Sequence, residues 1–236
     1  ISGGIFNAPV AEEFCAEGYI PKDNGDGTYG VKLGSYVAQI GETKYETVAA
    51  AVAAAQDGDV ITVVADVTVT APIVIEKSIT LDLGGKTIPG ENVYPVIRVQ
   101  GEASVTVQNG GIVNGDYVFV LGASDGSTAG NLVIESGSYK GETTVVSVTK
   151  GTLTVNGGTF EAVPYNGSYA YTLNCVDANY RNGTAVIVVN GGSFYKFNPA
   201  DNAAEGAATR FTTEGYKATA DGAVAALAAC RFIDSL

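Results

Sequence analysis

The chain has 236 residues and is acidic, with 25 aspartates and glutamates against 13 lysines and arginines and a formal charge of −12. Nucleic acids and anionic membranes require a positive protein face, so this charge argues against both as partners. No apolar run approaches the ~18 residues of a membrane span, and no membrane insertion is expected. Glycine occurs 31 times, whereas histidine, methionine and tryptophan are absent.

The three cysteines, Cys15, Cys175 and Cys230, have no Cys-x-x-Cys spacing and form an odd set. Neither a zinc site nor a complete disulfide framework is therefore predicted, and we expect buried structural thiols. No metal and no cofactor is predicted. Because the chain opens on Ile-Ser-Gly-Gly without methionine, we interpret it as a fragment or processed form of a longer protein, with any export signal outside it.

Residues 1–32 are predicted to be the tail of a preceding repeat unit or an N-terminal extension. The segment Asp23–Gly27 contains Asn-Gly and Asp-Gly between strand-like runs, which predicts a hairpin turn. A calcium loop would need a downstream glutamate that is missing here. Phe14–Tyr19 (FCAEGY) matches Phe211–Tyr216 (FTTEGY), at an offset of 197 residues from Phe14 to Phe211. We therefore expect one complete unit over residues 33–220, a C-terminal tail over 221–236, and a parent protein that is an array of such units.

One helix is predicted, over Tyr45–Gln56. Tyr45, Val48, Val52 and Ala55 fall on one helical face in an alanine-rich stretch. The predicted helix precedes the first predicted strand, Asp59–Val64, and we expect it to cap the open end of the fold.

A short phrase recurs along the chain. It consists of Gly-Gly or Ser-Gly, then a small or aliphatic residue, then an aromatic or aliphatic residue. From Gly111 onward its second glycine recurs after 26, 21 and 34 residues. A β-branched run precedes each of these phrases, so the glycines are interpreted as tight corners after strands. The strands predicted before the phrases are Ser104–Val107, Leu132–Ile134, Leu153–Val155 and Val186–Val189, and a second set is Tyr94–Val99, Tyr117–Leu121, Thr144–Val148 and Tyr169–Asn174.

Two or three short strands per repeat without long helices predict an all-β solenoid, a parallel β-helix in which each coil contacts only its neighbours. A β-sandwich is the structural alternative, but it would need hairpin turns every ~8–12 residues.

The order of predicted elements and two motifs carry a resemblance to a known family. The chain resembles the pectin-lyase-like right-handed parallel β-helix superfamily. The resemblance lies in Gly58–Val63 (GDVITV), in Ser78–Ile88 (SITLDLGGKTI) and in the runs closed by Asn-Gly-Gly. The chain is similar in particular to repetitive surface proteins of gut-type Gram-positive bacteria and to related phage tail proteins. This resemblance implies a right-handed parallel β-helix with one short N-terminal capping helix, and a secreted, cell-surface or virion location. It does not imply one activity, because this fold carries lyases, hydrolases, adhesins and tail spikes.

Enzymes of this superfamily use residues that can be searched for. The inverting hydrolases resemble one another in an Asn-x-Asp, an Asp-Asp pair, a Gly-His-Gly and an Arg-x-Lys, and the last three of these do not occur here. A pectate lyase would act on a polyanion, which a charge of −12 opposes. Asp82, Glu135 and Glu161 are interpreted as surface or turn residues, and no catalytic residue is assigned.

A binding site is predicted where tyrosines gather, over residues 165–195. Tyrosine offers an apolar ring to a sugar or protein partner, and Asp, Asn and Arg offer hydrogen bonds. These tyrosines could equally stack in ladders between neighbouring coils. The predicted ligand-binding residues are Tyr165, Tyr169, Tyr171, Asp177, Tyr180, Arg181 and Arg210.

The function expected from the sequence is that of a non-enzymatic, adhesin-like surface or virion module. It would bind a glycan or a host surface protein, immunoglobulin-type receptors included. Two alternatives stay open: a polysaccharide lyase or glycoside hydrolase of the same fold, and a purely structural spacer in a repetitive surface protein.

Overall fold

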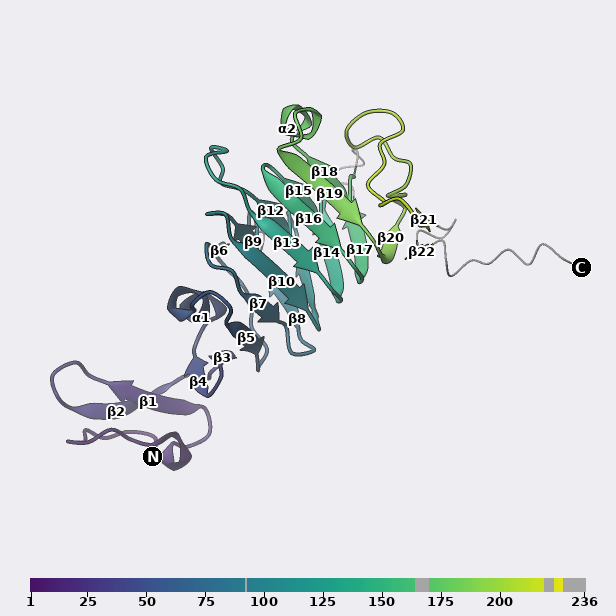
Figure 1. The fold of residues 1–236 in the computed structure, drawn as a ribbon. Helices are drawn as coiled ribbons and strands as arrows, with labels where there is room; N and C mark the ends of the chain where they lie inside the picture. Colours follow the sequence, from purple (N-terminus) through teal and green to yellow (C-terminus); the bar gives the residue numbers. More distant parts are fainter. Residues whose placement is uncertain (92, 164–169, 219–222, 227–236) are drawn as a thin grey trace, which may run out of the picture.

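The computed structural model describes residues 1–91, 93–163, 170–218 and 223–226. These residues form mostly β structure with short helices, as the sequence predicted. Three of the sheets consist largely of parallel strands, and a fourth is a two-stranded hairpin. Figure 1 shows the strands of the three sheets lying side by side, from α1 near one end to α2 near the other.

Sheet I has eight strands in the order β19-β16-β13-β10-β7-β5-β3-β4. From β5 to β19 every neighbouring pair is parallel, whereas β3 pairs antiparallel with both β4 and β5. Its strands are β3 (Ala38–Ile40), β4 (Thr43–Tyr45), β5 (Val60–Val63), β7 (Thr80–Asp82), β10 (Ser104–Gln108), β13 (Asn131–Ile134), β16 (Gly151–Val155) and β19 (Ala185–Val189).

Sheets II and III have seven and five strands. Sheet II contains β8 (Thr87–Gly90), β11 (Gly111–Asn114), β14 (Ser138–Glu142), β17 (Thr159–Val163), β20 (Gly192–Tyr195), β21 (Tyr216–Ala218) and β22 (Ala223–Ala226). Sheet III contains β6 (Ile73–Ile75), β9 (Ile97–Val99), β12 (Phe119–Leu121), β15 (Val146–Val148) and β18 (Leu173–Cys175).

The chain visits the three sheets in a fixed order. From β7 onward it runs through sheet I, sheet II and sheet III and then returns to sheet I, and we call each such round a passage. Every strand of one passage pairs in parallel with the equivalent strand of the next. These parallel pairs do not fit the antiparallel β-sandwich that was the structural alternative.

Alternate residues of each strand face the interior, because successive side chains of a strand point to opposite faces. The register aligns the inward residues of sheet I into one continuous apolar row. Each member of this row is at most 1% exposed, so every passage buries its β-branched or leucine side chain against the next. The row consists of Ile61, Leu81, Val107, Ile134, Val155 and Val189.

Aromatic rings form the equivalent inner row in sheet II. Tyr139 and Phe160 stack with ring centroids 5.4 Å apart, and Phe160 and Phe194 with centroids 4.9 Å apart. The stack continues through Phe197 to Phe211 at the end of the last passage. A ladder of buried aromatic rings is therefore present on the inner face of sheet II and continues beyond its last strand.

The glycine phrases begin strands as well as turning corners, which the sequence interpretation missed. Gly137, Gly158 and Gly192 have φ angles of 123°, 103° and 99°, a left-handed region that favours glycine. The sheet II strand starts at or directly after each of them. The residue that ends the phrase, Tyr139 or Phe160 for example, then points inward.

The N-terminal elements differ from the prediction in their bounds. Helix α1 covers Val48–Ala54, and Thr47 caps it by accepting a hydrogen bond from the Ala50 N–H at 3.0 Å. The prediction started too early, because Tyr45 belongs to β4. The inward side chains of α1 join the core next to β5 and β6. The predicted hairpin is confirmed: β1 (Tyr19–Asp23) pairs antiparallel with β2 (Tyr29–Leu33).

Two short helical elements were not predicted. A 3₁₀ turn, η1, covers Glu12–Phe14, and a short helix, α2, covers Asp177–Arg181 after β18. The predicted strand Tyr169–Asn174 corresponds to β18, which lies later in the chain, and Tyr169 falls outside the described residues.

Candidate functional site

The predicted ligand-binding residues lie in several different environments. Tyr165 and Tyr169 fall outside the described residues. Tyr171 is half-buried and packs against the core. Tyr180 is also half-buried, with its ring edge-on to Phe211 at a centroid distance of 6.2 Å.

The charged members of the predicted site lie near the last passage, and we call the series of passages the stack. Asp177 and Arg181 pair with each other along α2, with 3.4 Å between Oδ2 and Nη1. Arg210 is exposed, and its Nε donates to the Thr212 carbonyl at 3.5 Å. The structure thus brings Asp177, Tyr180 and Arg181 onto one short helix, and that surface as a binding site stays a prediction.

A carboxylate occupies the edge of sheet III beside this helix. The Cys175 N–H at the edge strand β18 donates to Glu205 Oε1 at 2.5 Å, where a further strand would have offered a carbonyl. Glu205 Oε2 is buried and has no hydrogen-bond partner among the described residues. Burial raises the pKa of Glu205, and burial followed by the nearby Glu205 charge raises that of the Cys175 thiol. Glu205 therefore closes the sheet edge, which is a structural role.

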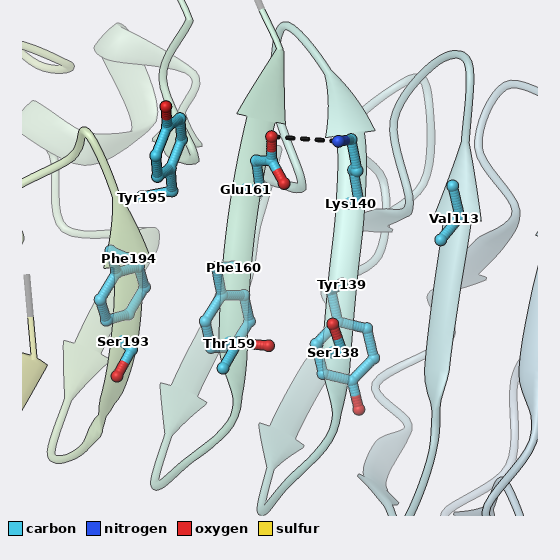
Figure 2. Close-up of a pocket in the computed structure, with 10 residues that line it drawn as sticks. All are labelled: Val113, Ser138, Tyr139, Lys140, Thr159, Phe160, Glu161, Ser193, Phe194 and Tyr195. Atoms are coloured by element: carbon cyan, nitrogen blue, oxygen red, sulfur yellow. Dashed lines mark hydrogen bonds and ion pairs between the residues drawn. The ribbon is translucent and has the colours of Figure 1, made fainter.

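A groove lies over the outer face of sheet II. It has a volume of ≈ 340 Å³, and Figure 2 shows its lining residues on four neighbouring parallel strands, β11, β14, β17 and β20. The lining consists of Val113, Ser138, Tyr139, Lys140, Thr159, Phe160, Glu161, Ser193, Phe194 and Tyr195.

Two outward rows cross the strands of this groove. Ser138, Thr159 and Ser193 are partners in register and form a row of exposed hydroxyl groups. Two residues further along each strand, the second row has Lys140, Glu161 and Tyr195 in register, with Val113 beside Lys140 on β11. A row of small hydroxyl side chains thus runs across the strands beside a parallel row of larger side chains.

The row of larger side chains combines an aromatic ring with charges. Tyr195 is 55% exposed, and Lys196 Nζ lies 5.1 Å from the centroid of its ring. Lys140 Nζ is 3.0 Å from Glu161 Oε1. A second hollow, of ≈ 360 Å³, shares Glu161 and Tyr195 and adds Lys196 to the lining. The described residues that line the two hollows thus include two lysines and one glutamate.

Sequence reasoning did not assign the groove, although a signal for it was present. Aligning the glycine phrases places Lys140, Glu161 and Tyr195 in the same position, one residue after the buried aromatic side chain. Because successive residues of a strand face opposite sides, that alignment predicts an outward row. The tyrosine count over residues 165–195 instead drew attention to the longest repeat.

The described residues do not contain a group of three or more Asp, Glu or Cys side chains that could hold a metal ion. Among the helices of those same residues, none is long and apolar enough to cross a membrane. No family model matches the chain, and no match is found among curated proteins or solved structures.

Proposed function

We propose that this chain is a right-handed parallel β-helix of the pectin-lyase-like type and a non-enzymatic surface module that binds a glycan in the groove over sheet II. The fixed order in which the chain visits three sheets, with parallel pairing between passages, supports the β-helix. Its right-handedness is supported by a general rule, since parallel strand connections are right-handed in ~98% of cases.

The groove is the observation that carries the proposed binding. A sugar ring has an apolar face, which an exposed tyrosine ring covers, and a rim of hydroxyl groups, which polar side chains bind. Tyr195 supplies the ring, and the row of Ser138, Thr159 and Ser193 supplies donors and acceptors. Neighbouring strands are ~4.8 Å apart. Equivalent side chains therefore recur along the stack at a spacing close to the length of one sugar unit in a polysaccharide.

The carboxylates of the groove favour binding over hydrolysis. Glycoside hydrolysis ordinarily uses two carboxyl groups on either side of the bond that breaks. Glu161 is the one acidic residue among the ten described residues that line the groove, and its Oε1 pairs with Lys140. A lone ion-paired carboxylate orients sugar hydroxyl groups and does not supply an acid and a base together.

A glycan array tests the proposal directly. We expect the full chain to bind at least one polysaccharide class, and Tyr195→Ala to lose most of that signal. Tyr94→Ala is the matched control, because Tyr94 is also 55% exposed and does not line the groove. Reducing-sugar and unsaturated-product assays on the bound glycans run in parallel.

Each outcome separates one alternative function from the others. Turnover of a polysaccharide would contradict the non-enzymatic proposal and favour a lyase or hydrolase. Binding to a host protein but to no glycan would overturn the glycan assignment. A folded chain that binds neither would favour a structural spacer. We place the module on a bacterial surface, in a secreted protein or on a phage virion, in keeping with the resemblance.

A further inference from the structure

The N-terminal segment, residues 1–33, repeats the arrangement in which the last passage ends. After β20, the chain crosses the end of the stack and returns as the hairpin β21–β22, whose second strand pairs antiparallel with β20. Residues 1–33 contain the hairpin β1–β2, and its second strand pairs antiparallel with Phe6.

The two arrangements agree in register. Gly192 lies opposite Val224 in the C-terminal arrangement. The bridge between Phe6 and Tyr29 sets the register in which Gly4 lies opposite Val31. Each of these glycines is the second of a Gly-Gly pair and has a positive φ angle, 115° at Gly4 and 99° at Gly192.

A second pair of hydrogen bonds also recurs. Val189 donates its N–H to the Phe211 carbonyl at 2.8 Å and accepts from the Thr213 N–H at 3.3 Å. In the N-terminal segment the Ile1 amino group donates to the Phe14 carbonyl at 2.5 Å, and the Ile1 carbonyl accepts from the Ala16 N–H at 2.8 Å. Ile1 thus takes the position of Val189, and Phe14 that of Phe211.

The equivalent apolar residues differ in what covers them. Val189 and Phe211 are 0% and 2% exposed, because the preceding passages pack beneath them. Ile1 and Phe14 are 43% and 59% exposed. Phe194 stacks on Phe160 of the preceding strand, whereas its equivalent, Phe6, has no ring contact among the described residues.

We propose that residues 1–33 are the closing cap of a second unit built like residues 34–226, and that a passage of that unit packs against Ile1, Phe6 and Phe14. The strand Gly3–Phe6 would then pair in parallel with an equivalent of β17, as β20 does. The chain is in this way a link in an array, with each unit ending on a cap of this kind. This inference does not depend on glycan binding.

An exchange of caps tests the proposal with three proteins. The first is the full chain. The second is a chain cut after Val188, which lacks the C-terminal cap, and the third is that cut chain followed by a second copy of residues 1–33. We expect the cut chain to melt well below the full chain, and the chain with the appended copy to melt within ~5 °C of it, where ~1 kcal/mol shifts the melting temperature by ~2–4 °C.

The same substitution in the two copies provides an internal control. Phe6→Ala in the appended copy is expected to lower the melting temperature, because that ring would stack on Phe160 as Phe194 does. Phe6→Ala in the first copy is expected to leave it unchanged. The proposal is overturned if the chain with the appended copy melts no higher than the cut chain, or if Phe6→Ala has the same effect in both copies.

Discussion

The two faces of sheet II are made by neighbouring residues of the same strands but have different roles. On β14, β17 and β20, Tyr139, Phe160 and Phe194 face inward and stack into the core. The next residue on each strand, Lys140, Glu161 or Tyr195, faces outward and lines the groove. The same pairing of strands therefore sets both the packing of the inner face and the chemistry of the outer face. Substitutions on one face can change stability, and substitutions on the other can change binding.

The largest effect is expected on the inner face. Phe160→Ala removes a ring that is 2% exposed and lies between Tyr139 and Phe194. Such a cavity lowers the free energy of unfolding by ~3–5 kcal/mol. Denaturant unfolding measures this loss, with Glu161→Ala, one residue further along the same strand, as the outward-facing control. A loss below ~1 kcal/mol for Phe160→Ala would contradict its role in the core.

A smaller, pH-dependent effect is expected at the end of the stack. The folded state raises the pKa of Glu205, so the protonated carboxyl is favoured there. The contribution of Glu205 to the free energy of unfolding should be fully present below the ordinary glutamate pKa of 4.5. It should be lost as the pH rises through the folded-state pKa. Glu205→Gln keeps an acceptor for the Cys175 N–H and cannot ionise.

Unfolding curves across the acidic range separate this group from Asp82. Asp82 is partly desolvated, but hydrogen bonds from Gly84, Gln108 and Asn109 outweigh that desolvation and lower its pKa. Its contribution is therefore lost as the pH falls through the folded-state value. We expect Glu205→Gln to remove the loss of stability that occurs as the pH rises above the ordinary glutamate pKa. The loss of stability at lower pH, to which Asp82 contributes, should be unchanged. An unaltered profile would contradict the buried state of Glu205.

On the outer face the expected effects on stability are the smallest. The side chains of Lys140 and Glu161 are 46% and 38% exposed, and pairs of this kind contribute ~0.2–1 kcal/mol. Glu161→Gln should therefore change the free energy of unfolding by less than ~1 kcal/mol, and less at high salt. A cost of several kcal/mol, measured by the same denaturant titration, would show that this face is structural.

The strands of sheet I could be predicted from the sequence because β-branched runs identify them locally. Leu153–Val155 and Val186–Val189 lie within β16 and β19. Sheet II was harder to predict, because Gly158 turns a corner and strand β17 begins directly after it. The groove could not be found from residue type alone. Tyr195 lies beside Glu161 only through the pairing of β17 with β20, two strands whose paired residues are 34 positions apart in the sequence.

The most direct test of the central claim is a map of backbone amide chemical shifts on adding a glycan that the chain binds. The groove over sheet II predicts that the largest shifts fall on β14, β17 and β20, around Lys140, Glu161 and Tyr195, and that α2 is unaffected. Shifts confined to α2 and its surroundings, with Asp177 and Arg181 at their centre, would contradict the groove and favour the site predicted from the tyrosine-rich segment.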